Sequence, residues 1–255
     1  MVLLSRFLVD QQIRYGVVEG DQICSLEEDF LSGIRLTGER FDLEEVFLLS
    51  PCRPSKIVCV GLNYLDHARE LNLSLPEEPI LFLKPSSSVI GPKQPIIYPS
   101  VSQQVDYEAE LAVVMGKTTR RVSATEARSK ILGYTCGNDV TARDLQWKDG
   151  QWTRAKSFDT FCPLGPWIRT DLDPENLELR MLVNEEVKQN SNTNQMVFGV
   201  DYLISFISQI MTLFPGDVVL TGTPVGVGAV KPGDNLTVEI KGLGRLTNWV
   251  KSEGI

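Results

Sequence analysis

The sequence predicts an α+β protein that is mostly β, with a small β-rich N-terminal domain followed by one larger domain. The chain has 255 residues, 42% of them hydrophobic and 23% charged, which suits a folded protein with a large core. Short β-like segments outnumber helical ones and do not alternate with them, which argues against a doubly wound parallel sheet and a (β/α)₈ barrel. Two prolines within residues 51–55 mark a junction after the first fifty residues.

The N-terminal segment has the pattern of a small antiparallel sheet. Short apolar runs predict strands at residues 7–9, 14–18 and 22–24, and Glu19-Gly20-Asp21 is typical of a turn between the last two. We therefore place a small β-rich domain at residues 1–52 and the larger domain at residues 53–255.

The larger domain combines several short strands with a few helices. A capping-box sequence begins the second predicted helix, and Pro215-Gly216 ends the third, whose apolar residues recur at helical spacing. The predicted helices are 63–71, 123–132 and 202–214. The predicted strands are 56–61, 79–84, 107–115, 177–183, 217–220, 236–240 and 245–250.

Composition argues against several classes of function. The net charge of −8 repels phosphate backbones, so we expect no nucleic-acid partner, and no apolar run approaches the roughly 20 residues of a membrane span. The five cysteines are scattered, without a C-x-x-C pair or an export signal, which indicates reduced thiols in the cytoplasm. Cys59 and Cys162 are interpreted as buried packing residues. His67 is the only histidine, so one chain cannot build a His-rich zinc site.

Acidic residues alternate with apolar ones in the segment 105–113. In a strand, Asp106, Glu108 and Glu110 would share one face, where their like charges repel one another. A divalent cation with a preference for oxygen ligands, such as Mg²⁺, Mn²⁺ or Ca²⁺, removes this repulsion. A solvated acidic face of an antiparallel strand is an equally good interpretation of the segment taken alone.

A further carboxylate, Asp139, lies among apolar and small residues, so it is either a ligand or paired, with Arg143 as the nearest candidate partner. Lys156 either holds an anionic substrate or pairs with Asp159. The glycine-rich run 220–228 fits neither a Walker loop nor a dinucleotide motif, and is either a carboxylate-binding loop or a tight turn.

The single histidine has an acidic neighbour at helical spacing. If the segment is helical, His67 and Glu70 lie at positions i and i+3 and face each other. A carboxylate bound to an imidazole selects its tautomer and raises its basicity, which makes a general base. A surface histidine on a charged helix is the alternative interpretation.

Taken together, these segments resemble the fumarylacetoacetate hydrolase family. Six motifs occur in the order of the family, from about residue 55 to the C-terminus. They are 60–64 with His67 and Glu70, 79–85, 106–111, 138–146, 155–160, and 220–224 with Gly226 and Gly228. Any one of these motifs is weak, but six in the same order are a specific match.

The resemblance implies a mixed β-roll with a small N-terminal domain, and a homodimer. It also implies Glu108, Glu110 and Asp139 as ligands of Mg²⁺, with Mn²⁺ as the alternative. His67 and Glu70 match the water-activating pair. Lys156 matches a catalytic position, and Gln146, Thr223 and the adjacent Gly222 match substrate-contacting positions. We expect Asp106 to lie beside the metal ligands rather than on the metal.

The activity implied by the resemblance is Mg²⁺-dependent hydrolysis of a C–C bond in an acylpyruvate-type 2-oxo acid through a metal-chelated enolate. The alternatives are oxaloacetate decarboxylation and isomerisation or decarboxylation of 2-hydroxyhepta-2,4-diene-1,7-dioate, and a non-catalytic metal-binding protein is the least favoured. Some relatives have Arg in place of Leu62 and many have Gly in place of Ser157, so the substrate pocket differs from theirs. Residues 70–78 are a candidate mobile lid over the site.

Overall fold

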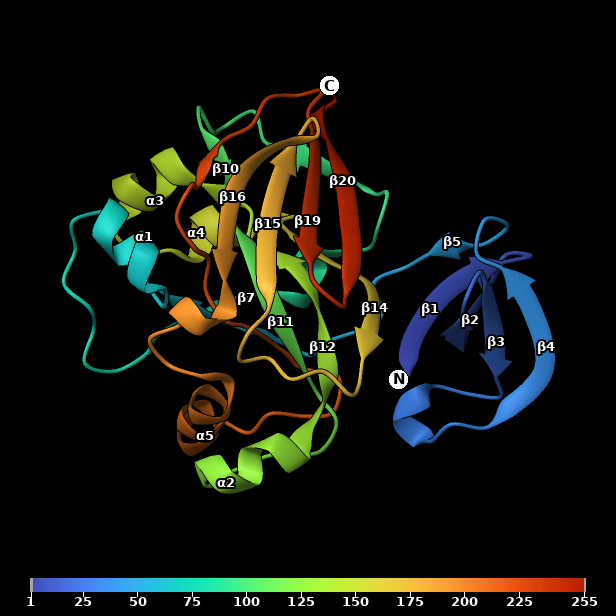
Figure 1. The fold of residues 1–255 in the computed structure, drawn as a ribbon. Helices are drawn as coiled ribbons and strands as arrows, with labels where there is room; N and C mark the ends of the chain where they lie inside the picture. The colour runs from blue at the N-terminus through green and yellow to red at the C-terminus, as the bar shows by residue number, and fades with distance from the viewer. Residues whose placement is uncertain (1, 255) are drawn as a thin grey trace.

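The computed structural model describes residues 2–254 (Figure 1). Strand pairing gives one long sheet of 12 strands. The strands of this sheet are β1 Leu3–Val9, β2 Gln12–Glu19, β3 Gln22–Leu26, β4 Leu36–Asp42, β5 Phe47–Leu48, β6 Ile57–Gly61, β7 Ile80–Lys84, β8 Val89–Ile90, β11 Ala109–Met115, β12 Ile131–Asn138, β14 Cys162–Arg169 and β17 Val218–Leu220. The strand order is β4-β3-β2-β1-β14-β12-β11-β17-β6-β7, with β5 paired to β1 and β8 to β14.

Two smaller sheets complete the β structure. One has the order β16-β15-β19-β20-β9, and the other β13-β10-β18. Their bounds are β9 Pro95–Tyr98, β10 Val105–Tyr107, β13 Thr141–Ala142, β15 Glu178–Val183, β16 Glu186–Asn192, β18 Gly228–Ala229, β19 Asn235–Ile240 and β20 Gly244–Ser252. The predicted class, mostly β with a mixed β-roll and a β-rich N-terminal region, is confirmed.

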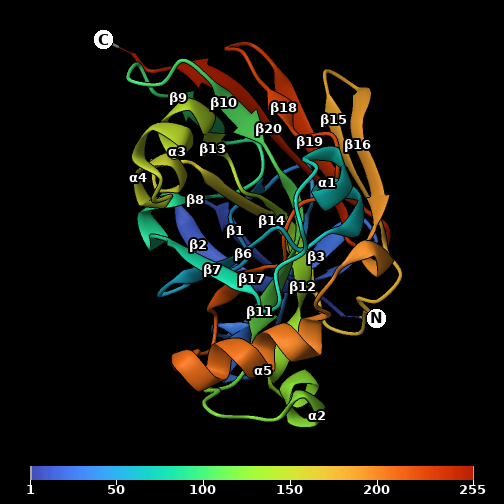
Figure 2. The same ribbon diagram turned by 90° about the vertical axis from the view of Figure 1, so that its left-hand side faces the viewer.

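Short helices lie at the two ends of the sheets (Figure 2). They are α1 Leu65–Glu70, α2 Ala124–Ala127, α3 Arg143–Asp149, α4 Thr153–Lys156 and α5 Val200–Ile210, with 3₁₀ turns at Phe30–Ser32, Ser86–Ser88, Arg128–Lys130 and Thr193–Gln195. Both views place α1, α3 and α4 toward one end and α2 with α5 at the other. None of the helices among residues 2–254 has the length and hydropathy of a membrane span.

The N-terminal strands are part of the long sheet. Leu3 and Leu4 of β1 pair antiparallel with Arg169 and Ile168 of β14. The three strands predicted here are confirmed, whereas β4 and β5 were not predicted, because β4 is largely exposed and lacks an apolar pattern. The division into domains after residue 52 stays a prediction.

One strand separates the two largest clusters of buried apolar side chains. Leu111, Val113 and Met115 of β11 pack into one cluster, while Ala112 and Val114 pack into the other. Both faces of β11 are therefore buried, and any polar side chain on this strand needs a partner inside the protein.

The predicted strand 107–115 is interrupted. β10 ends at Tyr107 and β11 begins at Ala109, in a different sheet, with Glu108 between them. The Glu108 N–H donates to Asn138 Oδ1 at 3.0 Å and the Ala109 N–H to Gln189 Oε1 at 2.9 Å. These two side chains replace ladder partners, so the break leaves neither donor unsatisfied.

All three predicted helices are shorter than expected, and the first, predicted at residues 63–71, is α1 Leu65–Glu70. The capping box is present at Ser123, but α2 ends at Ala127, and β12 begins at Ile131 after a 3₁₀ turn. The helix predicted at residues 202–214 is α5, which ends at Ile210 because Leu213 instead exchanges backbone hydrogen bonds with Thr119. In both places a long-range strand contact ends the local helical pattern.

Candidate active site

A pocket of about 580 Å³ is lined in part by residues of α1, α3 and α4. Every predicted site residue except Gly222 lines it. These residues are His67, Glu70, Asp106, Glu108, Glu110, Asp139, Gln146, Lys156 and Thr223. Aromatic and aliphatic side chains that include Phe82, Trp147 and Trp152 form much of the remaining wall.

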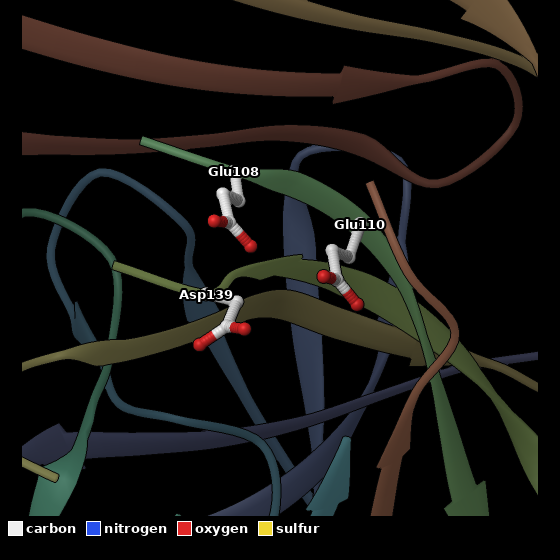
Figure 3. Close-up of side chains that lie close together, drawn as sticks. All are labelled: Glu108, Glu110 and Asp139. Atoms are coloured by element: carbon white, nitrogen blue, oxygen red, sulfur yellow. The ribbon is translucent and has the colours of Figure 1, made fainter. Parts of the chain in front are cut away.

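Three carboxylates meet at the base of this pocket (Figure 3). Glu108 and Glu110 come from the break before β11 and from β11 itself, and Asp139 directly follows β12. One oxygen from each lies within 4.8 Å of the others, and the three residues are only 7%, 2% and 1% exposed. The solvated acidic face considered from the sequence is therefore wrong, because these carboxylates are buried.

Two buried lysines neutralise part of this charge. Lys156 Nζ donates to Glu108 Oε2 at 2.9 Å and to Asp139 Oδ2 at 2.6 Å. Lys84 Nζ, at the end of β7, donates to Asp139 Oδ1 at 2.5 Å and to the Val140 carbonyl at 3.0 Å. Burial alone lowers the pKa of Lys156, but Asp139 and Glu108 raise it above its usual value, so the ammonium stays charged.

Glu108 is held ionised by its neighbours. Burial alone raises the pKa of this carboxyl, but the Lys156 ammonium and the Arg143 guanidinium hold it well below its usual value. Arg143 pairs with Glu108 and, through Nε, with Asp106 Oδ2 at 2.8 Å. Its Nη1 also donates to Gln146 Oε1 at 2.5 Å. Asp106 thus orients the arginine beside the cluster.

Glu110 has a different environment. Its carboxylate accepts the Gly222 N–H at 2.7 Å, and no ion pair within 4.0 Å is formed by it among residues 2–254. Burial raises its pKa well above the usual value, and the nearby charges of Asp139 and Glu108 raise it further. A divalent cation between the three carboxylates would remove this repulsion, and buried carboxylate oxygens are the donors that hard cations prefer. The donor set therefore fits the expected metal ion.

The histidine and its acidic partner lie on the same pocket. His67 Nδ1 lies 3.0 Å from Glu70 Oε2 across one turn of α1. The Gly226 N–H donates to the Glu70 carboxylate at 3.2 Å, which holds the acid in place. An ionised carboxylate only accepts hydrogen bonds, so in the neutral imidazole Nδ1 carries the proton and Nε2 keeps a free lone pair.

The glycine-rich run supports the site through its backbone. Gly222 has a φ of 99°, and a Cβ here would lie 2.9 Å from the Cβ of Asn63, so only glycine fits. Thr223 Oγ1 donates to the Ala109 carbonyl at 3.0 Å and accepts from Gln189 Nε2 at 2.9 Å. Gly222 therefore contacts Glu110 rather than the pocket itself, and the ordinary tight turn is the weaker interpretation.

Two pairings considered from the sequence are wrong. Arg143 pairs with Asp106 and Glu108 rather than with Asp139, and Lys156 pairs with Glu108 and Asp139 rather than with Asp159. Sequence reasoning also missed Lys84 and Gln189. Lys84 closes an apolar strand before a proline, which was a usable signal, whereas nothing local marks Gln189.

None of the cysteines among residues 2–254 lines the active-site pocket. All five are free and buried. Burial raises the pKa of the Cys52 and Cys136 thiols to about 12 and holds those of Cys59 and Cys162 well above their usual value. The interpretation of Cys59 and Cys162 as packing residues agrees with this environment.

Comparison with known proteins gives two family matches. Residues 56–251 match the model described as "Fumarylacetoacetate (FAA) hydrolase C-terminal", and residues 4–51 match "Rv2993c-like, N-terminal". The uncharacterised protein MJ1656 of Methanocaldococcus jannaschii is 55% identical over 216 residues, which is 85% of this chain and 89% of that protein.

Two further relatives have named activities. The mitochondrial oxaloacetate tautomerase FAHD2A of Bos taurus is 50% identical over 219 residues, which is 81% of this chain and 70% of that protein. The crystal structure of a 2-hydroxyhepta-2,4-diene-1,7-dioate isomerase from Mycobacterium marinum superposes with a TM-score of 0.94 at 44% identity, over 100% of both chains.

Proposed function

The chain belongs to the fumarylacetoacetate hydrolase family, and we propose that it transfers a proton at C3 of a 2-oxo acid with a second carbonyl group at C4. Keto–enol tautomerisation of an oxaloacetate-type acid is the reaction favoured here. One observation carries the proposal: the His67–Glu70 pair lines the same pocket as the three carboxylates and Lys156. The names of the tautomerase and isomerase relatives support proton transfer.

We assign the base to His67. Its Nε2 removes the C3 proton while Nδ1–H stays bound to Glu70, which stabilises the imidazolium that forms. The electron pair of the C3–H bond forms the C2=C3 double bond, the π pair of the C2 carbonyl moves to the 2-oxo oxygen, and a proton returned to this oxygen gives the enol. Lys156 uses two of its three N–H donors on Glu108 and Asp139, which leaves one for a substrate oxygen.

Glu108, Glu110 and Asp139 would hold the metal ion, for which we propose Mg²⁺, with Mn²⁺ as the alternative. Such an ion supplies Lewis-acid stabilisation of the negative charge that develops on the 2-oxo oxygen. Arg143 and Gln146 lie on the same wall and would orient the substrate carboxylate through N–H donors.

Hydrolysis of the C3–C4 bond of an acylpyruvate is the second candidate function. It uses the same base, because His67 can remove a proton from water rather than from carbon, and that water then attacks the C4 carbonyl. Decarboxylation of oxaloacetate breaks the C3–C4 bond and leaves its electron pair in the same enolate, with the negative charge on the 2-oxo oxygen. This reaction needs no base. The expected homodimer, the cytoplasmic location and the lid at residues 70–78 stay predictions.

A substrate panel tests the proposal. We would follow three reactions with Mg²⁺, with Mn²⁺ and with chelator. They are the disappearance of the oxaloacetate enol by tautomerisation, the decarboxylation of oxaloacetate and the cleavage of acetylpyruvate. We expect metal-dependent tautomerisation that falls by about 10²–10⁴-fold in His67→Gln. Arg69→Gln is the matched control, because Arg69 is exposed on the same helix and does not line the pocket. Tautomerisation at the parent rate in His67→Gln would exclude the assigned base, and acetylpyruvate cleavage without tautomerisation would favour the hydrolase.

A further inference from the structure

A second polar pocket lies at the junction between the N-terminal strands and the rest of the long sheet. It measures about 520 Å³ and shares no lining residue with the active-site pocket. Its lining residues include Arg6 of β1, Arg53 of the junction segment, Ser86, Ser87 and Gln94. No Asp or Glu among residues 2–254 lines this pocket.

The two arginines of this pocket belong to the minority of arginines without an ion pair among residues 2–254. Other arginines, such as Arg128, Arg154 and Arg245, form ion pairs with carboxylates. Within residues 2–254, neither Arg6 nor Arg53 has a carboxylate within 4.0 Å. The local surplus of positive charge therefore occurs in a protein whose net charge is −8.

Arg6 also has an unsatisfied donor. Its Nη1 donates to the Ser50 carbonyl at a long 3.4 Å, and its Nε is buried without a hydrogen-bond partner. A buried guanidinium N–H without an acceptor is costly and calls for an explanation in a native structure.

The nearest acid does not supply that acceptor. Asp29 lines a smaller adjoining cavity with both arginines, but its carboxylate accepts a hydrogen bond from the Leu31 N–H at 2.9 Å, and no ion pair within 4.0 Å joins it to either arginine among residues 2–254. Both arginines also line the larger pocket, where no carboxylate of residues 2–254 competes for them.

We propose that this pocket binds a small molecule through a phosphate or carboxylate group held by Arg6 and Arg53. The planar guanidinium presents paired donors that match both oxyanions, and serine hydroxyls can supply further donors. The volume lies in the range of small-molecule sites. Because Arg6 belongs to the N-terminal strands and Ser86 follows β7, a bound anion bridges the two parts of the chain.

Binding would be measured by calorimetry and by thermal unfolding with inorganic phosphate and with tricarballylate, each at constant ionic strength. We expect saturable binding of at least one anion and a higher Tm, because the ligand binds the folded chain. If only phosphate binds, the natural ligand is held through a phosphate group. If only tricarballylate binds, it is held through a carboxylate group.

Arg53→Gln should weaken the affinity about tenfold, because it removes one charge-assisted pair of hydrogen bonds. Arg53 is exposed and unpaired within residues 2–254, so this variant should keep the parent Tm without anion. Arg120→Gln makes the same charge change outside the pocket, and His67→Gln alters only the active-site pocket, so both should bind as the parent does. Equal affinity of Arg53→Gln and parent, or no saturable binding of either anion, would overturn the proposal.

Discussion

The three carboxylates of the cluster differ in their electrostatic partners. Asp139 contacts two lysines, and Glu108 contacts Lys156 and Arg143. Among residues 2–254, Glu110 accepts a hydrogen bond only from the Gly222 N–H, and the charges of the other two acids raise its pKa more than Lys156 lowers it. Glu110 is therefore the residue whose ionisation depends most on a bound cation.

This difference predicts a pH dependence of stability in metal-free protein. The folded-state pKa of Glu110 is raised, so above the usual glutamate pKa of 4.5 the folded chain holds a proton that the unfolded chain has lost. The free energy of unfolding therefore falls as the pH rises above this value. Urea unfolding in chelator between about pH 5 and about pH 8 should show this fall in the parent and a smaller one in Glu110→Gln.

Added Mg²⁺ should reverse the loss in the parent at neutral pH, because a cation takes the place of the proton. Glu110→Gln should respond weakly to Mg²⁺. An unchanged pH slope in Glu110→Gln would mean that another group titrates.

At the scale of the element, the break between β10 and β11 positions two of the three carboxylates. It places Glu108 outside both strands, while Glu110 stays on the face of β11 that also carries Ala112. Gln189 of β16 reaches this break and bonds the Ala109 N–H, Thr223 and the Pro224 carbonyl. One buried amide therefore connects the acidic strand to the glycine-rich run.

We predict that Gln189→Ala lowers the free energy of unfolding by about 1–3 kcal/mol, because it leaves the buried Ala109 N–H unsatisfied. It should also weaken metal affinity by about tenfold or more, because residues that support ligands act in this way. Urea unfolding and metal titration measure the two effects. Val187→Ala on the same strand is the control, since Val187 is 48% exposed, and equal effects of the two variants would refute the assigned role.

The elements themselves were predicted where local pattern is sufficient. Apolar runs located β6, β7, β15, β17, β19 and β20, because a buried strand needs a continuous or alternating apolar sequence. Helix ends were predicted less well. Ile131 and Leu213 belong to helical patterns in sequence, but each makes strand contacts with a distant segment. A short sequence segment does not show whether a distant strand will replace its local helical structure.

At the scale of the whole molecule, the N-terminal strands share a core with the rest. Leu4, Leu26 and Phe30 pack in the same cluster as Ile57 and Val218. Together with the pairing of β1 and β14, this contact makes the long sheet continuous across the predicted domain boundary.

We therefore predict that residues 53–255 alone do not fold stably. Removing residues 1–52 uncovers one edge of β14 and the apolar surface under Leu4 and Phe30, which favours aggregation. Circular dichroism and light scattering of the truncated chain would measure this, with the full chain as reference. A monomeric fragment with a cooperative transition at the parent Tm would contradict the prediction and support independent domains.

The sequence by itself determined the chemistry that is available. The spacing of His67 and Glu70 on one turn, and the acidic residues around an apolar strand, depend only on local periodicity. Only the tertiary structure decided which charges meet. Lys84 and Lys156 reach Asp139 from 55 and 17 residues away, and Gln189 reaches Ala109 from 80 residues away. These contacts arise because the packing of distant strands brings their ends together, and no pattern within a single segment encodes that packing.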